Sequence, residues 1–313
     1  HIFHPTAVAA PTRHITKLQK RSGNQNWESR LTKMHSDDGT GVDSDTEGDL
    51  DDEFVDQFLT SKWQDGVETG LIVQWPGLTK SLHLSTQLPE TAIAPLFDGT
   101  QWAGTRVWKA ALLAFQYLQE EITSSSSTSR SSLLELGCGL GVPGMLWHAL
   151  CTEQKKSNLE GESHRVVLTD QPSLLSQLQS NLHSNFPEDD RITAQALPWS
   201  KEGVLELLQQ QKDITGNKED FSFDICLNCD CIYEPLYGRD AWVALADVLQ
   251  AFAEHSPSTL LITAVERRNA DGLEHFLERL QSSPCVEPVQ RVMRDDNDKH
   301  HVIEIYVTKG KET

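Results

Sequence analysis

Four glycines between Leu136 and Met145 are the residues of this sequence with the clearest chemical implication. The segment from Leu133 to Gly144 reads LLELGCGLGVPG, an apolar run followed by a glycine-rich turn, and residues 145–150 resume at helical spacing. Glycines let the backbone approach a ligand closely and adopt positive φ, and the start of the next helix offers free N–H groups to polar atoms. The segment therefore predicts a strand–turn–helix site for a nucleotide-like ligand.

Two kinds of ligand fit this turn. Residues 139–144 match the dinucleotide pattern G-x-G-x-x-G, which alone is a weak signal. Residues 135–141 match E-x-G-x-G-x-G, in which Glu135 stands two positions before the first glycine. A carboxylate so close to the turn is poorly placed beside a pyrophosphate, but it suits a ligand that carries an ammonium and a sulfonium. The acid favours the second ligand; a glycine-rich turn that binds nothing is the remaining alternative.

Two further candidates follow the predicted strands at residues 165–170 and 192–197. Asp170 closes the first strand, where a carboxylate can accept hydrogen bonds from both hydroxyls of a ribose; its alternative role is to cap the next helix. Trp199 comes just after the second strand and can offer a ring face or its N–H to a base, although a core position also suits it. Ligands of open α/β sheets bind beyond the carboxyl ends of the strands, so both residues are placed for binding.

Asp230 and Tyr233 form a D-x-x-Y pattern directly after the predicted strand 223–229. An acid there can accept a hydrogen bond from an incoming amine and orient its lone pair, and a tyrosine can add a wall or a hydroxyl contact. The alternative is that Asp230 begins a loop and Tyr233 packs beneath it. The sequence offers no evident general base, no Ser-His-Asp order and no metal-ligand spacing, so we expect no metal.

Alternating strands and helices are expected to position these residues. Strands are predicted at residues 70–75, 82–88, 133–136, 165–170, 192–197, 223–229, 259–265, 286–293 and 301–307, with a turn at residues 76–77 and a charged turn at residues 294–299. Helices are predicted at residues 105–118, 145–150, 172–185, 240–255 and 272–280, and residues 211–220 read as a polar insertion. We therefore expect an α/β, Rossmann-like fold: a seven-stranded, mostly parallel sheet with an antiparallel C-terminal edge, helices on both faces and a small N-terminal β extension.

These motifs, in this order, resemble the protein-lysine branch of the class I (seven-β-strand) S-adenosylmethionine-dependent methyltransferases. The resemblance spans about residues 70–309. It rests on the glycine turn, Asp170, Trp199, the D-x-x-Y pattern and three further segments: GTRVWKAA (104–111), LITAVERR (261–268) and HVIEIY (301–306). The sequence departs from the family pattern in its longer spacings at residues 124–132, 153–163 and 211–220, and in Lys109 and Cys229, where an acid and a small residue are common.

The resemblance implies S-adenosyl-L-methionine as the cofactor and a lysine ε-amine of a protein, possibly a translation factor or a chaperone, as the methyl acceptor. By position, Asp230 and Tyr233 would face the lysine. The cofactor pocket would be lined by Trp108, Glu135, Gly137, Cys138, Gly139, Asp170, Trp199 and Cys229. Alternatives are a non-catalytic binding module that keeps the fold and a small-molecule methyltransferase. A nicotinamide oxidoreductase is disfavoured by Glu135, by the D-x-x-Y pattern and by the terminal strand pair.

Charge and composition narrow the classes of function. The 313 residues carry a net charge of −19, which argues against non-specific nucleic-acid binding, so we expect no nucleic-acid partner. No apolar run is long enough to span a bilayer, so no membrane is expected either. Cys226 should alternate away from Cys229 and Cys231, which favours buried thiols over a zinc site and indicates a reducing compartment, the cytoplasm or also the nucleus. The oligomeric state does not follow from the sequence.

Three regions are expected along the chain. Residues 1–56 should form a disordered, acidic tail, because ten Asp or Glu and no Lys or Arg lie between Asp37 and Asp56; such a tail could also engage a basic partner. Residues 57–103 should form the N-terminal β extension. Residues 104–313 should form the S-adenosylmethionine-dependent methyltransferase domain.

Overall fold

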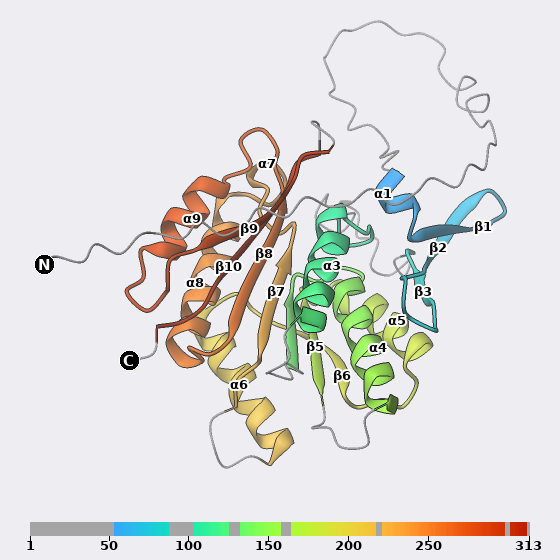
Figure 1. The fold of residues 1–313 in the computed structure, drawn as a ribbon, viewed down its shortest axis with the longest axis horizontal. Coiled ribbons are helices and arrows are strands. Elements are labelled where there is room, and N and C mark those ends of the chain that lie inside the picture. Colours follow the sequence, from blue (N-terminus) through green and yellow to red (C-terminus); the bar gives the residue numbers. More distant parts are fainter. Residues whose placement is uncertain are drawn as a thin grey trace, which may run out of the picture. The chain divides into compact units, whose positions relative to one another are not determined.

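A computed structural model describes residues 53–87, 103–124, 132–157, 164–216, 221–297 and 301–311 (Figure 1). The acidic tail predicted for residues 1–56 therefore lies outside the described residues up to residue 52. Most of residues 124–132 and parts of the insertions at residues 153–163 and 211–220 also lie outside the described residues. Glu53–Asp56 forms the short helix α1, so the described chain is already helical at the end of the predicted tail.

Seven strands form the central sheet in the order β6-β5-β4-β7-β8-β10-β9 (Figure 1). They are β4 (Ser132–Leu136), β5 (Arg165–Asp170), β6 (Ile192–Ala196), β7 (Ile225–Cys229), β8 (Leu260–Glu266), β9 (Gln290–Asp295) and β10 (Ile303–Thr308). β4 pairs in parallel with β5 and β7, and these pair in parallel with β6 and β8. β10 runs antiparallel to β8 and β9. The predicted mostly parallel sheet with an antiparallel C-terminal edge is confirmed.

Two layers of helices bury the sheet. The helices are α3 (Lys109–Ser124), α4 (Val142–Ser157), α5 (Leu175–Asn185), α6 (Lys201–Thr215), α7 (Glu234–Tyr237), α8 (Arg239–His255) and α9 (Leu273–Gln281). α3, α4 and α5 share one hydrophobic core with the sheet, and α6, α8 and α9 share a second. Successive strand residues supply the two cores in turn, since Leu133 belongs to the first and Leu134 to the second. A strand buried on both faces explains the continuous apolar run in the sequence.

A smaller antiparallel sheet precedes the main one, in the order β1-β2-β3. Its strands are β1 (Leu59–Gln64), β2 (Val67–Val73) and β3 (Leu82–Ser85). The predicted pairing of residues 70–75 with 82–88 is present as β2 with β3, where Gly70 faces Ser85. β1 was not predicted, because its pattern LTSKWQ is mostly exposed and has little apolar alternation.

Side-chain amides and an aromatic contact attach this small sheet to the helices. The Oδ1 atoms of Asn181 and Asn185, both on α5, accept hydrogen bonds from the backbone N–H groups of Ser85 (2.8 Å) and His83 (2.7 Å). These bonds satisfy part of the edge of β3, which would otherwise present unpaired backbone groups. Trp75 packs edge-on against Phe115 of α3 at 4.9 Å between ring centroids. The N-terminal sheet is thus joined to two helices of the same core.

Most elements begin or end a few residues from the predicted boundaries, and two differences are larger. The helix α6 was not predicted, and residues 211–215, predicted as part of an insertion, form its last turn; Ser200 caps α6 by accepting from the N–H of Gly203 (3.1 Å). The strand predicted at 286–293 begins only at Gln290, because Pro288 has no N–H to donate to a ladder.

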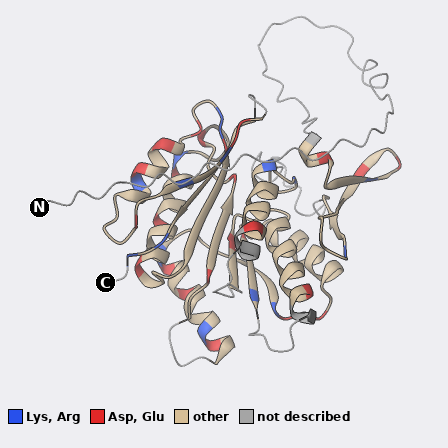
Figure 2. Cartoon of the chain, viewed as in Figure 1, with Lys and Arg blue, Asp and Glu red and all other residues tan. Residues whose placement is uncertain are grey.

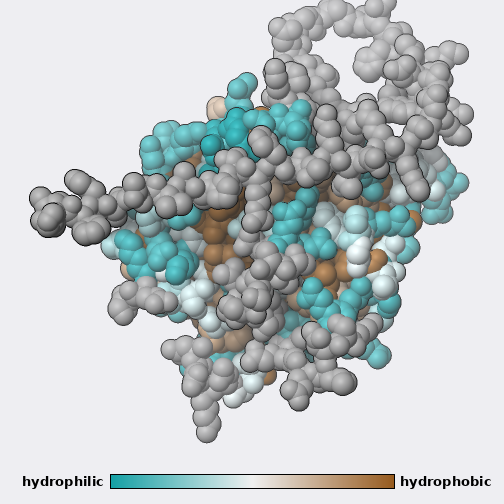
Figure 3. All heavy atoms as spheres, in the orientation of Figure 1, coloured by the Kyte–Doolittle hydropathy of each residue, from teal (hydrophilic) through white to brown (hydrophobic). Residues whose placement is uncertain are grey.

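Charge follows the same layering. Few Lys, Arg, Asp or Glu lie on the central strands, whereas both signs are frequent on the outer helices (Figure 2). In the space-filling view, hydrophilic residues gather along the upper rim and hydrophobic residues show toward the middle of the face (Figure 3). Among the described residues, no helix is long and apolar enough to cross a membrane.

Candidate active site

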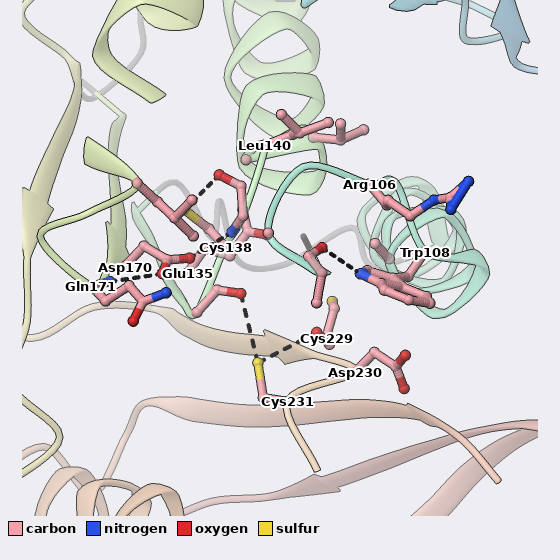
Figure 4. A pocket seen from close by; sticks show the side chains of 18 of the residues that line it. Arg106, Trp108, Glu135, Cys138, Leu140, Asp170, Gln171, Cys229, Asp230 and Cys231 are labelled. Atoms are coloured by element: carbon pink, nitrogen blue, oxygen red, sulfur yellow. Dashed lines mark hydrogen bonds between the residues drawn. The ribbon is translucent and has the colours of Figure 1, made fainter. Parts of the chain in front are cut away.

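A pocket of about 610 Å³ lies beyond the carboxyl ends of the central strands (Figure 4). It opens where the strand order reverses, since β5 lies on one side of β4 and β7 on the other, which is where open α/β sheets bind ligands. Nine of the residues predicted for the site line it: Trp108, Glu135, Gly137, Cys138, Gly139, Asp170, Trp199, Cys229 and Asp230. The tenth, Tyr233, is not among the lining residues.

The glycine turn is shaped by positions that no other residue type would fit well. Gly137, Gly139 and Gly141 have φ of 58°, 54° and 72°. A Cβ on Gly137 would stand 2.8 Å from Cys231 Sγ and 3.1 Å from the ring of Trp199. The turn therefore leaves its backbone bare toward the pocket, with Trp199 against it, as a close backbone approach to a ligand requires.

Glu135 is a buried carboxyl with a strongly perturbed acidity. Its Oε2 accepts a hydrogen bond from the N–H of Gly144 in the first turn of α4 (2.9 Å), and its residue is 1% exposed. Burial raises the pKa of Glu135 to about 8; the Gly144 N–H opposes this and the charge of Asp170 adds to it. A cationic ligand would stabilise the ionised form of this carboxyl, so Glu135 would interact most strongly with a positively charged group.

Asp170 links the glycine turn to the end of β5. Its two oxygens accept from the N–H of Gly139 (2.7 Å) and the N–H of Gln171 (2.7 Å), and burial raises its pKa. A carboxylate has about four lone-pair sites, so acceptors remain for a pair of hydroxyls. The alternative of a helix cap is not observed, because the N-cap residue of α5 is Leu174 and no side chain caps this helix.

The cysteines of the pocket line it with neutral thiols and do not act as nucleophiles. Burial raises the pKa values of Cys138, Cys229 and Cys231, so their thiols stay neutral. The predicted alternation holds for Cys226 and Cys229, which belong to different cores, but it is wrong for Cys231. Cys231 shares the core of Cys226 because β7 ends at Cys229 and the alternation ends with it.

Asp230 lies at the end of the pocket opposite Asp170, below the ring of Trp108 (Figure 4). Its backbone has a left-handed φ of 55°, and its N–H donates to the carbonyl of Ala264 (2.8 Å). Its carboxylate is 4% exposed as a residue and accepts two hydrogen bonds from Arg268, at 3.0 and 2.8 Å. Asp230 is therefore already paired with a cation, which its position in the sequence did not indicate.

Two residues near Asp230 were missed by the sequence prediction. Tyr237, one helical turn after Tyr233, lines the pocket, and burial together with the nearby carboxylate of Asp230 raises the pKa of its phenol. Tyr233 instead faces Arg268, whose Cζ lies 5.1 Å from its ring centroid. The second missed residue, Arg268, lies just after β8, within the segment LITAVERR that carried the family resemblance. The charged triplet at the end of this segment could have indicated it.

Comparison with known proteins identifies a family for this chain. A family model described as lysine methyltransferase matches residues 96–283. A secreted RxLR effector protein 48 of Plasmopara viticola is 35% identical over 145 residues, which cover 44% of this chain and 64% of that protein. EEF1A lysine methyltransferase 3 of Mus musculus is 28% identical over 194 residues, covering 61% of this chain and 68% of that protein. The chain thus spans just under two thirds of the first relative's length.

A solved structure was also found in the comparison. The structure of a human methyltransferase 10 domain containing protein is 11% identical, covers 65% of this chain and 83% of its own, and has a TM-score of 0.42.

Proposed function

The chain belongs to the lysine methyltransferase family, and we propose that it uses S-adenosyl-L-methionine as methyl donor and the ε-amine of a lysine in a protein as acceptor. The observation that supports this most is the arrangement of acids in one pocket. Glu135 and Asp170 stand at one end and Asp230 at the other. A cationic cofactor and an amine acceptor need such groups on opposite sides of the reacting methyl.

The residues at the glycine turn fit the cofactor. The bare backbone at Gly137 makes room for the ligand, the ring of Trp199 stands beside it, and Asp170 keeps acceptors for ribose hydroxyls. Glu135 provides a buried carboxyl for a positive group. Trp108 is fixed by the hydrogen bond from its Nε1 to the carbonyl of Ala103 (3.0 Å), so its ring forms a stable wall.

The methyl group is supplied by the cofactor as an electrophile, and the chain's own residues orient the acceptor. Asp230 accepts a hydrogen bond from the lysine amine and directs its lone pair toward the methyl, while Trp108 and Tyr237 exclude water from that end of the pocket. Tyr233 acts at the rim of the acceptor site through its contact with Arg268. No step requires a side-chain nucleophile.

We propose a translation factor as the first substrate to test. The Mus musculus relative is named for methylating a lysine of EEF1A, and elongation factor 1A is therefore the natural probe. Chaperones are the second class. We further propose a reducing compartment, the cytoplasm or the nucleus, because all six cysteines are free thiols in the described structure.

Two measurements test this function. Calorimetric titration with S-adenosylhomocysteine, beside NAD, should show micromolar binding of the former alone; tight binding of NAD alone would support an oxidoreductase instead. Methyl-labelled S-adenosyl-L-methionine with purified elongation factor 1A should then label a lysine. Asp230→Asn should keep S-adenosylhomocysteine affinity within about twofold and lower transfer about a hundredfold, while the exposed α8 variant Asp240→Asn should retain activity. Cofactor binding without transfer to any protein would favour a non-catalytic module.

A further inference from the structure

Arg268 is joined to the proposed acceptor carboxylate by a two-point hydrogen bond. Its Nη1 donates to Asp230 Oδ1 (3.0 Å) and its Nη2 to Asp230 Oδ2 (2.8 Å). Nη2 also donates to Glu266 Oε2 (2.7 Å), and the Glu266 N–H donates to Asp230 Oδ1 (3.1 Å). A guanidinium that meets a carboxylate at two points fixes its plane as well as its position. Asp230 is therefore held in one orientation by a group from the neighbouring strand end.

The same guanidinium lies against two aromatic rings of the site. Its Cζ is 5.5 Å from the ring of Trp108 and 5.1 Å from the ring of Tyr233. Both distances fall within the range of cation–π contacts, and the Arg268 side chain is only 19% exposed. Tyr233, which does not line the pocket, thus contacts the arginine that holds Asp230.

The acids around the acceptor position outnumber the cations, and Arg268 offsets part of their charge. Asp230 and Glu266 are the acids and Arg268 is the cation, while His301 Nδ1, two residues before β10, contacts Glu266 Oε1 (2.6 Å). Tyr237 of α7 is neutral, because burial raises its pKa. Although burial lowers the pKa of Arg268, the two acids raise it above its usual range, so this cation is permanent.

We propose that Arg268 is a positioning residue of the acceptor site: it fixes Asp230, and its charge favours the neutral amine over the ammonium of the incoming lysine. This rests on the proposed function. A lysine needs a free lone pair to react, and Asp230, the lining carboxylate at the acceptor end, already accepts two hydrogen bonds from Arg268. A fixed positive charge nearby lowers the pKa of an amine, so the proton leaves to water before transfer. The amine lone pair then forms the N–C bond, the electrons of the broken C–S bond return to sulfur, and the extra proton of the product leaves to water.

Three variants separate this role from a structural one. Arg268→Gln removes the charge, Arg268→Lys keeps it without the two-point bond, and Arg267→Gln is the matched control. Arg267 is the adjacent arginine, but its partners are Asp271, Glu274 and Glu304 rather than Asp230. Thermal unfolding and S-adenosylhomocysteine titration of each variant show whether the fold and the cofactor pocket are retained.

The first readout is the pH dependence of methyl transfer to elongation factor 1A. Arg268→Gln should move the alkaline rise of kcat/KM upward by about one pH unit, which corresponds to about tenfold lower activity near neutral pH. Arg268→Lys should lower kcat but keep the wild-type pH profile, and Arg267→Gln should keep both. An unchanged profile in Arg268→Gln would contradict the proposal. A lower KM with undiminished kcat in Arg268→Gln would also contradict the proposal, because it would show that Arg268 only competes with the substrate lysine for its site.

The second readout does not depend on the natural substrate. n-Butylamine, a surrogate for the lysine side chain, is titrated into the S-adenosylhomocysteine complex between about pH 7 and pH 10. Wild type should bind it more tightly as the pH rises, because the neutral amine is preferred, and Arg268→Gln should lose this trend. The same pH trend in both proteins would overturn the role of Arg268. If elongation factor 1A and other proteins receive no methyl from wild type, the proposed function fails, and this titration still decides the role of Arg268.

Discussion

Replacing Glu135 with glutamine should stabilise the protein without cofactor and weaken its binding of the cofactor. In the folded state burial raises the pKa of Glu135 from 4.5 to about 8, whereas in the unfolded chain the carboxyl is exposed. Because the folded-state pKa is the higher one, the carboxyl contributes stability below about pH 4.5, and that contribution is lost as the pH rises toward 8. Glutamine removes the pH-dependent penalty but also removes the negative charge that a cationic ligand would use.

The size of the effect follows from the distance between the two pKa values. Near pH 7 the protein lies about 2.5 pH units above the unfolded-state pKa, which corresponds to a penalty of about 3 kcal/mol. Glutamine can still accept the Gly144 N–H, but its own buried NH₂ is not provided with a partner, which costs about 1–2 kcal/mol. A net gain of about 1–2 kcal/mol in the free energy of unfolding is expected near neutral pH.

Urea unfolding of both proteins at about pH 5 and about pH 7.5 measures this directly. The gap between Glu135→Gln and wild type should grow by about 3 kcal/mol from the lower to the higher pH, and the exposed α6 variant Glu206→Gln should show no such growth. S-adenosylhomocysteine affinity of Glu135→Gln should fall at least tenfold. A pH-independent gap, or a variant that binds as tightly as wild type, would refute the reasoning.

Three further changes test other parts of the structure. Asp170→Ala should lower S-adenosylhomocysteine affinity about tenfold or more in calorimetry, and unchanged affinity would leave Asp170 with only its backbone contacts. Gly137→Ala should destabilise the fold by about 1–3 kcal/mol in urea and reduce cofactor affinity, because its Cβ would meet Cys231 at 2.8 Å; a variant as stable as wild type would contradict this. Burial lowers the pKa of His148 from 6.5 to about 4, although Asp189 opposes the shift, so its stabilising contribution is present above about pH 6.5 and is lost as the pH falls toward 4. The free energy of unfolding of His148→Gln should therefore fall less steeply with decreasing pH than that of wild type. An equally steep fall would show that His148 does not contribute to the acid sensitivity.

The fold could be predicted because its signals are local. Apolar runs, a glycine turn and strand–helix alternation each lie within a few residues, and the rule that ligands bind at strand ends brings Asp170 and Asp230 to one pocket. What escaped prediction had weak or misleading local patterns. β1 buries little of its LTSKWQ sequence, and α6, which was missed as a whole, ends in polar residues that resemble a loop.

The partners of the site residues could not be read from the sequence. Arg268 is 38 residues from Asp230, and they meet only because β7 and β8 pair in parallel with their carboxyl ends together. A D-x-x-Y pattern places two side chains near a strand end, but it does not say which of them faces the pocket. The burial that raises the pKa of Glu135 likewise depends on the packing of α4 against the sheet.

One pocket is proposed to bind the cofactor and to present a lysine to it. The most direct measurement is mass spectrometry of elongation factor 1A after incubation with S-adenosyl-L-methionine and either wild type or Asp230→Asn. We expect a methylated lysine with wild type and at most about a hundredth of that methylation with the variant, although both bind S-adenosylhomocysteine equally. Equal methylation by the two proteins would contradict the account, because the methyl acceptor would not then be oriented by Asp230.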